Sequence, residues 1–377
     1  MNELTYWTTL AFIQGITVKR KNEIYVKCWE HSPRISIEQL FQDSSVWEGI
    51  GLTPEECEIF ANSRNNLANN SFLVENLLSQ GYNIIPITSQ DYSKTLKNNL
   101  GTISPTVLFS KGNLYLLQEP AAAIVGSRNA DTISLQFTSE MAKKCVSDGK
   151  VVVSGFAKGV DKMALDAALE AGGKSIIVLP QGITTFASGF KQYYKYILQG
   201  RLLVVSMFYP NAPWSAEFAM RRNPYIYGLA DEIYVAQSDE KGGTWSGVID
   251  GLRKKRTIYV RKPNVNERNA NILLIQKGAT AVDNQGTPIP VAPEEMLTSE
   301  ERNKQQLITR IQSILSTSGE LTSKAILEKT SIDWSDKKIK EFLRSSPCRE
   351  LIEEHKYKNR ILFRIKGTTN QSEIKFD

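Results

Sequence analysis

Glycines and basic residues occur together in three segments of the chain, and this combination could bind an anion such as phosphate. Glycine lets the backbone approach a phosphate closely, free amides at a helix start favour negative charge, and a nearby Arg or Lys adds a full positive charge. A single glycine after a strand is most often only a turn residue, but its repetition beside basic residues favours anion binding. The residues concerned are Gly126, Ser127 and Arg128; Ser154, Gly155, Lys158 and Gly159; and Lys241, Gly242, Gly243 and Thr244.

The sequence does not group residues for acid–base catalysis or for binding a metal or a cofactor. Its two histidines, His31 and His355, lie near opposite ends of the chain, and its four cysteines are spaced singly. The segment 172–175 (GGKS) resembles the end of a Walker A loop, but Ala168 stands where glycine is needed and a strand follows. We therefore expect a binding protein without enzymatic activity, metal or cofactor. Asp161 stands where a helix N-cap belongs, and we expect it to cap a helix.

The three glycine-containing segments follow short aliphatic runs that alternate with helical patterns. Near-continuous aliphatic strands separated by helices are typical of an α/β fold with a parallel sheet covered on both faces. Ligands of open parallel sheets bind outside the carboxyl ends of the strands, which is where these segments fall. We expect strands at 83–86, 106–110, 121–126, 151–155, 176–179, 202–205, 232–236 and 257–260, and helices at 133–147, 161–171 and 245–252.

Changes in the pattern of expected helices and strands divide the chain into several parts. In the first part, Thr53-Pro54-Glu55-Glu56 has the N-cap, proline and acidic residues typical of a helix start. We expect helices at 55–67 and 71–78 there. In the last part, helices at 305–316, 322–330 and 335–345 precede two strands, which is the order of a winged-helix domain. The expected segments are a helical domain at 1–80, a Rossmann-like sheet domain at 81–285, a proline-containing linker at 286–302, a winged-helix-like domain at 303–367 and a tail at 368–377.

The overall charge and the hydrophobic pattern restrict the class of protein only mildly. The chain has 46 Lys plus Arg and 40 Asp plus Glu, a formal net charge of +6. Such an excess permits an anionic partner without requiring one. No apolar run approaches the roughly 20 residues of a membrane span, and the first residues do not have the pattern of a signal peptide. Because scattered cysteines suit a reducing compartment, we expect a cytoplasmic protein that does not contact a membrane.

Several short motifs, taken in order, resemble those of the DNA processing protein A (DprA/Smf) family. The resemblance covers about 80 to 285 and also fits a helical, SAM-like N-terminal part and a C-terminal winged-helix-like part. No single motif is specific, but the combined order is. The motifs are 91–96 (DYSKTL), 105–114 (PTVLFSKGNL), 123–128 (AIVGSR), 153–161 (VSGFAKGVD), 222–223 (RN), 228–230 (GLA) and 277–279 (KGA).

This resemblance implies an extended Rossmann-like domain that binds single-stranded DNA in a basic pocket, usually as a homodimer, and loads a RecA-type recombinase. By matching motif, it assigns binding to Gly126, Ser127, Arg128, Ser154, Gly155, Lys158, Gly159, Arg221, Arg222 and Asn223. The sequence departs from the family pattern at Leu165, at Pro224 and at 180–182, where a His, an Arg and a glycine-rich turn are usual. These departures suggest a divergent branch working in phage defence or plasmid biology, with a recombinase or an operon partner protein.

Aromatic and basic side chains elsewhere could add to DNA binding. Bases of a single strand stack on aromatic rings, and the third helix of a winged-helix layout is the element that enters a major groove. The aromatic candidates are Phe156, Phe186, Phe190 and Tyr193. The basic candidates of the C-terminal part, for duplex or partner contact, are Lys337, Lys338, Lys340, Arg344, Lys356, Lys358 and Arg360.

The alternative function is a nucleotide-derivative sensor or an N-glycosidic phosphoribohydrolase. The run Gly242-Gly243-Thr244 resembles a glycine-glycine-threonine loop of nucleoside-monophosphate phosphoribohydrolases. In those enzymes a Glu follows shortly after the Thr, whereas here 245–248 contains no carboxylate and Asp250 comes further along the expected helix. The DNA-binding hypothesis in turn requires that Arg128 and Lys158 face one shared cleft, and that acidic groups do not line it.

Overall fold

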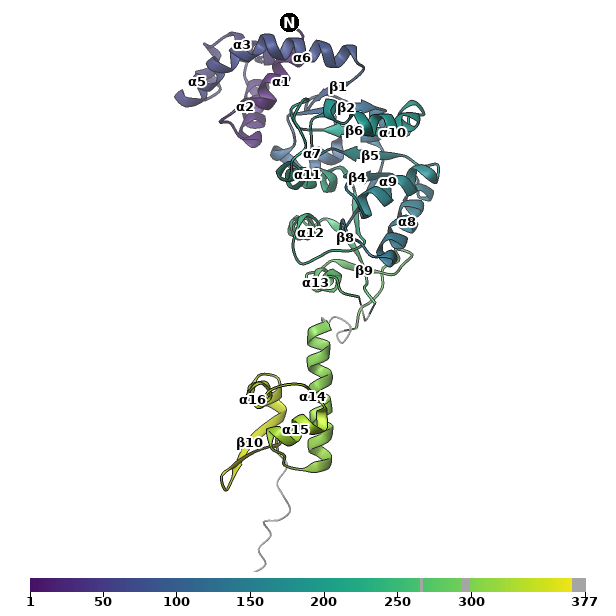
Figure 1. Cartoon of the computed structure of the whole chain (residues 1–377). Helices are drawn as coiled ribbons and strands as arrows, with labels where there is room; N and C mark the ends of the chain where they lie inside the picture. The colour runs from purple at the N-terminus through teal and green to yellow at the C-terminus, as the bar shows by residue number, and fades with distance from the viewer. Residues whose placement is uncertain (265–266, 293–298, 368–377) are drawn as a thin grey trace, which may run out of the picture. The chain divides into compact units, whose positions relative to one another are not determined.

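The computed structural model describes residues 1–264, 267–292 and 299–367 (Figure 1). The chain consists of two compact units, 1–292 and 293–377, which we describe separately. The expected tail at 368–377 and part of the expected linker lie outside the described residues. The division into five segments therefore stays a prediction. Among the described helices, none combines the length and the hydrophobicity that crossing a bilayer would require.

The first unit begins with six short helices. As the sequence predicts, Thr53 caps α5: its side chain accepts a hydrogen bond from the Glu56 amide, and the Glu56 carboxylate accepts one from the Thr53 amide. These helices share one hydrophobic core with the sheet that follows. The side-chain amide of Asn22 also links α2 to the segment before β2, because it donates to the carbonyl oxygens of Thr102 and Ser104 at 2.8 and 2.9 Å. The helices are α1 (Glu3–Phe12), α2 (Val18–Glu30), α3 (Ile37–Gln42), α4 (Val46–Gly49), α5 (Pro54–Ser63) and α6 (Leu67–Ser79).

A nine-stranded sheet forms the centre of the first unit, in the order β1-β2-β6-β5-β4-β3-β7-β8-β9. The strands from β6 to β9 in that order are parallel, whereas β1 and β2 run antiparallel to their neighbours. The predicted fold class, a largely parallel α/β sheet after a helical N-terminal part, is confirmed. The strands are β1 (Asn83–Pro86), β2 (Val107–Gly112), β3 (Ala121–Val125), β4 (Val151–Ser154), β5 (Ser175–Val178), β6 (Leu202–Ser206), β7 (Glu232–Val235), β8 (Thr257–Arg261) and β9 (Thr280–Val282).

Helices cover both faces of this sheet, because both sets of strand side chains are apolar. In β3, Ala122 and Ile124 pack with α8 and α9 on one face, while Ala121 and Val125 belong to the core of the other face, which contains residues of α11 and α12. The helices of this region are α7 (Lys94–Leu100), α8 (Thr132–Ser147), α9 (Val160–Glu170), α10 (Ala187–Leu198), α11 (Ala216–Leu229), α12 (Gly243–Arg253) and α13 (Asn271–Gln276), with 3-10 turns η1 (Arg64–Asn66), η2 (Gly101–Ile103), η3 (Leu114–Gln118) and η4 (Ile183–Thr185).

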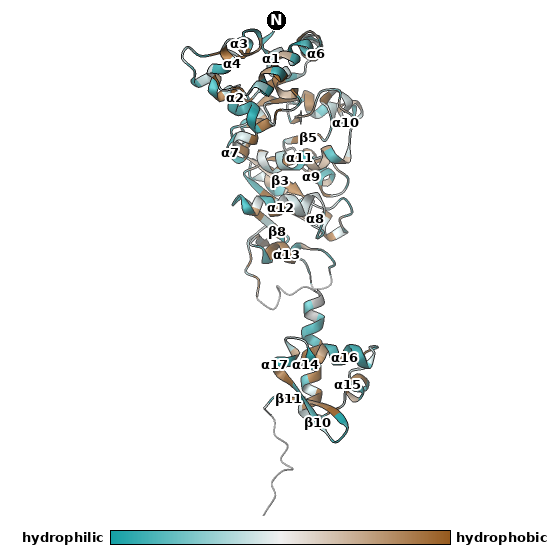
Figure 2. Ribbon diagram, turned by 90° about the vertical axis from the view of Figure 1, so that its left-hand side faces the viewer, coloured by the Kyte–Doolittle hydropathy of each residue, from teal (hydrophilic) through white to brown (hydrophobic). Residues whose placement is uncertain are grey.

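The second unit has helices followed by an antiparallel hairpin, in the order that the sequence predicts. Its core contains Ile311, Ile339 and Phe363, and the hydrophobic residues of β11 and of the later turns of α14 are visible in Figure 2. Assignment of this unit as a winged-helix domain stays a prediction. The elements are α14 (Ser299–Ser318), α15 (Ser323–Thr330), α16 (Asp336–Arg344), α17 (Cys348–Leu351), β10 (Ile352–Tyr357) and β11 (Arg360–Ile365).

Candidate functional site

A cavity of about 380 Å³ lies where the strand order of the sheet reverses. From β3 the chain adds β4, β5 and β6 on one side, then returns to place β7, β8 and β9 on the other side. The loops after β3 and β7 therefore diverge, and ligands of open α/β sheets bind in the crevice between such loops. We call this cavity the switch-point pocket. Its lining includes Gly126, Ser127, Arg128, Asn129, Asp161, Met220, Arg222, Asn223, Tyr227, Asp239, Lys241, Gly242, Gly243 and Thr244.

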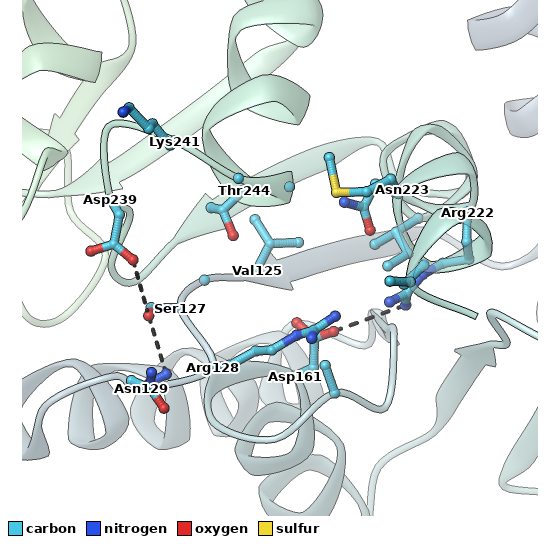
Figure 3. Close-up of a pocket in the computed structure, with 18 of the residues that line it drawn as sticks. Val125, Ser127, Arg128, Asn129, Asp161, Arg222, Asn223, Asp239, Lys241 and Thr244 are labelled. Atoms are coloured by element: carbon cyan, nitrogen blue, oxygen red, sulfur yellow. Dashed lines mark hydrogen bonds and ion pairs between the residues drawn. The ribbon is translucent and has the colours of Figure 1, made fainter. Parts of the chain in front are cut away.

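The loop after β3 is held in place by backbone and hydroxyl hydrogen bonds. The Ser127 amide donates to the Gln237 carbonyl at 2.9 Å, which ties this loop to the end of β7. The Ser127 hydroxyl accepts from the Asn129 amide at 3.1 Å and donates to Asp239 Oδ2 at 3.5 Å. The next residue, Arg128, is exposed, and its side chain extends over the pocket toward Asp161 (Figure 3). The loop thus presents a guanidinium group at the mouth of the pocket.

The N-terminus of α12 forms the opposite wall of the switch-point pocket. Gly242 is the N-cap with φ of 94°, and no side chain caps the helix. The amides of the first helical turn have no partner within the helix itself, so they favour an anion in front of them. Gly243 and Thr244 belong to this turn and line the pocket. The neighbouring Lys241 is exposed, and its side chain extends away from the other labelled residues (Figure 3).

A buried ion pair forms part of the pocket floor. Arg222 and Asp161 are only 3% and 7% exposed, and Arg222 Nη1 lies 3.9 Å from Asp161 Oδ2. Arg222 Nη1 also donates to the Val178 carbonyl at 3.2 Å, whereas its buried Nε has no hydrogen-bond partner. Burial raises the pKa of the Asp161 carboxyl, and the Arg222 charge opposes that increase. The predicted N-cap role of Asp161 is wrong, because Gly159 is the N-cap of α9. Asp161 instead compensates the charge of Arg222.

Of the segment 154–159, only Ala157 lines the pocket, so the structure does not gather this segment around it as the predicted anion cradle. The segment's backbone already faces an anion, because the amides of Gly155 and Ala157 are among the groups that lower the pKa of the Asp161 carboxyl against the effect of burial. The amide of Val160, at the start of α9, donates to the Ser127 carbonyl at 3.3 Å. Lys158 is exposed outside the pocket lining, so it does not share a cleft with Arg128 as the hypothesis requires.

Two glycines of this segment are needed for packing rather than for contact with a ligand. A Cβ atom at Gly155 would lie 1.4 Å from Arg222 Nη1. A Cβ atom at Gly159, where φ is +85°, would lie 2.5 Å from the Ser127 carbonyl oxygen. The missing Cβ atom at Gly155 makes room for the buried guanidinium of Arg222. The missing Cβ atom at Gly159 lets the loop after β3 pack against the start of α9.

The structure therefore brings together most of the predicted site residues and leaves the others outside. Gly126, Ser127, Arg128, Arg222, Asn223, Lys241, Gly242, Gly243 and Thr244 line the switch-point pocket. Ser154, Gly155, Lys158, Gly159 and Arg221 do not. The Ser154 hydroxyl donates to the Asp161 carbonyl at 2.6 Å, and exposed Arg221 pairs with Glu217 at 3.5 Å.

Acidic side chains also line the pocket, contrary to the expectation of a purely basic cleft. They are Asp161 and Asp239, set against Arg128, Arg222 and Lys241. Because Arg222 is opposite Asp161, the free charges at the mouth are Arg128, Lys241 and Asp239. The lining keeps one positive charge in excess. Asp239 was missed although it follows β7 by four residues, a position that the strand-end rule could have marked.

The four aromatic residues that are candidates for stacking on bases pack on one another. Phe156 lies edge-on to Phe186 and to Tyr193, with ring centroids 4.9 and 5.7 Å apart, and Phe190 packs edge-on against Phe186 at 5.4 Å. Tyr193 donates to Asp166 at 2.5 Å and accepts a hydrogen bond from Lys162. Burial raises the pKa of the Tyr193 phenol, and the bond to Asp166 raises it further. We call this group the aromatic cluster. None of its rings lines the switch-point pocket.

Several other groups singled out in the sequence have internal partners as well. Asp250, the candidate carboxylate after the glycine-glycine-threonine loop, pairs with Lys254 at 2.7 Å and does not line the switch-point pocket. In the second unit, Lys340 pairs with Asp336 at 2.6 Å and Arg344 with Glu354 at 2.8 Å. Within the described ranges, no three His, Cys, Asp or Glu side chains gather as a metal site would require.

Comparison with known proteins places the sheet domain in a known family. Residues 83–290 match the family described as DNA recombination-mediator protein A. DNA processing protein DprA of Bacillus subtilis is 31% identical over 214 residues, which are 54% of this chain and 69% of that protein. Protein Smf of Escherichia coli is 25% identical over 257 residues, 68% of this chain and 66% of Smf. The structure of DprA from Streptococcus pneumoniae matches with a TM-score of 0.61 and 23% identity, covering 76% of this chain and 96% of that one. The last likeness concerns the fold alone.

Proposed function

The chain belongs to the DNA recombination-mediator protein A family, and from this premise we propose that it binds single-stranded DNA and acts in DNA processing. The observation that carries the proposal is the switch-point pocket, because Arg128 and the uncapped N-terminus of α12 line the same cavity. A guanidinium and helix-terminal amides are groups that bind phosphate. Names of the relatives point to DNA, and the pocket supplies a place for its backbone. Lys158 lies outside the pocket and two carboxylates line it, but Arg128, Arg222 and Lys241 leave the lining with one positive charge in excess.

The arrangement supports binding through phosphate rather than a fixed base sequence. A phosphate seated between Arg128 and Thr244 would meet a full charge on one side and backbone amides on the other. The buried pair of Asp161 and Arg222 holds the pocket floor, because its two charges compensate each other where water is excluded. Asp239 beside Ser127 repels a second phosphate at that end. We therefore propose that the pocket takes one backbone phosphate and that the strand leaves it along the sheet edge.

Substitution of Arg128 tests the proposal directly. Arg128→Ala removes the exposed guanidinium at the mouth, and we expect about tenfold weaker binding of a fluorescent oligodeoxythymidylate. The slope of log affinity against log salt should also decrease by about 0.7, the value for one phosphate contact on a single strand. Lys143→Ala is the matched control, because Lys143 is an exposed cation on α8 that pairs with Glu140. Unchanged affinity and slope in Arg128→Ala would remove the phosphate assignment.

The geometry does not favour a phosphoribohydrolase. Asp250 is paired with Lys254 and does not line the pocket. Of the two carboxylates that line it, Asp161 is buried and paired with Arg222. The other, Asp239, precedes the glycine-glycine-threonine run and does not take the place of the Glu that follows the Thr in those enzymes. Hydrolysis of an N-glycosidic bond needs a carboxylate that can reach the reacting sugar. We propose that the protein is a binding protein and not an enzyme. Incubation with nucleoside monophosphates should release no free base, and measurable release by liquid chromatography would contradict this.

We also propose, from the family resemblance, that the protein works in the cytoplasm as a homodimer. A RecA-type recombinase or an operon partner protein would then receive the strand, in recombination, phage defence or plasmid biology. The four cysteines, which are free, are consistent with a reducing compartment. Sedimentation of the purified chain measures the dimer, and a monomer at micromolar concentration in the presence of DNA would contradict it.

A further inference from the structure

A second cavity, of about 530 Å³, lies between the N-terminal helices and the sheet. Its walls come from α1, from the α5–α6 region and from the loop after β6. Phe12 of α1 and Tyr209 of that loop meet edge to face, with ring centroids 5.0 Å apart. We call it the asparagine cavity. It is lined by Thr9, Phe12, Ile13, Gln14, Ile59, Asn62, Ser63, Asn66, Asn69, Asn70 and Tyr209.

Most polar side chains of this cavity are amides, and the others are the hydroxyls of Thr9, Ser63 and Tyr209. Asn70 is 6% exposed and fixed in place: its amide donates to the Thr9 hydroxyl at 2.9 Å, and its oxygen accepts from the Tyr209 hydroxyl at 3.5 Å. The amides of Asn62, Asn66 and Asn69 are exposed, and no described residue forms a hydrogen bond with their side chains. Three amides thus retain both a donor and an acceptor at the wall of one cavity.

The residues lining the cavity restrict the chemistry of its ligand. They include no Lys, Arg, Asp or Glu, so nothing there compensates a phosphate or a carboxylate. An amide offers a donor and an acceptor side by side, which is the pattern presented by the edge of a nucleobase. Aromatic rings such as Phe12 and Tyr209 supply surface on which a planar base packs. The volume is in the range of small-molecule sites, so it accommodates at least one base with its sugar.

The asparagine cavity also lies along the same edge of the sheet as the switch-point pocket. Tyr209 follows β6 by three residues, and β6 runs parallel to β5, β4 and β3. The carboxyl ends of these strands therefore share one edge. Three strand spacings of about 4.8 Å separate β3 from β6, so the axes of these two strands lie about 14 Å apart. A single strand that runs along this edge can therefore pass both cavities.

We infer that the asparagine cavity binds a nucleobase of the single strand whose phosphate occupies the switch-point pocket. The inference rests on the proposed function and extends it. Phosphate binding at Arg128 is independent of the bases. The amides contact a base edge and are independent of phosphate charge. The two cavities therefore contribute separable parts of the affinity.

The test compares a normal oligonucleotide with one that has no bases. The full chain carrying both Asn66→Ala and Asn69→Ala is titrated with oligodeoxythymidylate and with an abasic oligodeoxynucleotide of the same length. We expect the double variant to bind oligodeoxythymidylate about tenfold more weakly, with an unchanged slope of log affinity against log salt. Its binding of the abasic oligonucleotide should not change. Asn65→Ala is the matched control, because Asn65 is an exposed asparagine of the same turn that does not line the cavity. A thermal melt of each variant confirms that it is folded.

Each result supports or overturns the inference. Selective loss on the oligonucleotide with bases supports it. Unchanged binding of both ligands, or equal loss on both, overturns it, and the proposed function still stands if Arg128→Ala weakens both ligands. If the unmodified chain binds neither oligonucleotide, the proposed function and this inference fail together.

Discussion

The switch-point pocket and the aromatic cluster lie at the same edge of one sheet, yet only the first is hollow. The pocket is formed by the loops after β3 and β7, where the strand order reverses. The cluster fills the region after β4 and β5, where the chain continues in one direction and its rings pack at centroid distances of 4.9–5.7 Å. A glycine or an aromatic residue at a strand end therefore does not define a site. The order of the strands decides whether the space stays open.

The two regions also differ in how their cations are used. Lys162, beside the aromatic cluster, pairs with Asp166 at 2.9 Å and contacts the Tyr193 hydroxyl. Arg128 has no ion pair within the part of the chain that the structure describes, although Asp161 and Arg222 feel its charge. A paired cation stabilises the protein, whereas an uncompensated one at a cavity mouth is available to a ligand. The switch-point pocket is thus arranged for binding and the aromatic cluster for stability.

The largest effect that would sharpen this comparison is expected from Gly155→Ala. The new methyl group would overlap Arg222, so the buried guanidinium must move away from Asp161. We expect a loss of about 3 kcal/mol in the free energy of unfolding, measured in urea. Gly81→Ala is the control, because Gly81 has φ of +73° and open space around it; it should cost about 1 kcal/mol. Equal stability of Gly155→Ala and the unmodified chain would show that the buried pair does not support the pocket.

A smaller effect is expected from Tyr193→Phe in the aromatic cluster. The change removes the hydroxyl that joins Lys162 to Asp166 and keeps the ring. Because the two partners are partly exposed, we expect a loss of about 1 kcal/mol in unfolding free energy. Binding of oligodeoxythymidylate should not change. Weaker binding at preserved stability would break the comparison, since the cluster would then contribute to the site.

The smallest effect is expected from Lys158→Ala. Sequence motifs assign Lys158 to the binding site, but it is exposed outside the pocket lining. We expect less than a twofold change in affinity and no change in the salt slope of binding. A change as large as that of Arg128→Ala would mean that the strand crosses the start of α9.

Local patterns were sufficient to predict the elements that carry the site. The aliphatic run at 121–126 corresponds to β3 (Ala121–Val125), and the run at 151–155 corresponds to β4 (Val151–Ser154). Since parallel strands end at one edge, placing Arg128 and Thr244 at that edge required only the strand assignments. Their approach across one pocket required the order of the strands, which no local pattern contains.

Long-range pairing explains what sequence reasoning missed. Asp161 and Arg222 come from α9 and α11, and nothing in either local sequence indicates that they form a pair. The glycines of the motifs led to a prediction of phosphate contact. A glycine, however, permits close approach to the backbone equally well for a phosphate and for a side chain of the protein itself. At Gly155 the approaching group is Arg222 of the protein itself. The asparagine cavity was missed for a similar reason, since Asn66 and Tyr209 meet only after the helices dock on the sheet.

The mutual fit of the loop after β3 and the start of α9 has a consequence for engineering this protein. Val160 occupies the space that a side chain at Gly126 would need, and the carbonyls of Ser127 and Arg128 occupy the space beside Gly159. Neither loop has a shape independent of the other. A chimaera that takes one of them from a relative should lose its fold at this junction unless the other is transplanted with it, so the two segments form one unit of exchange.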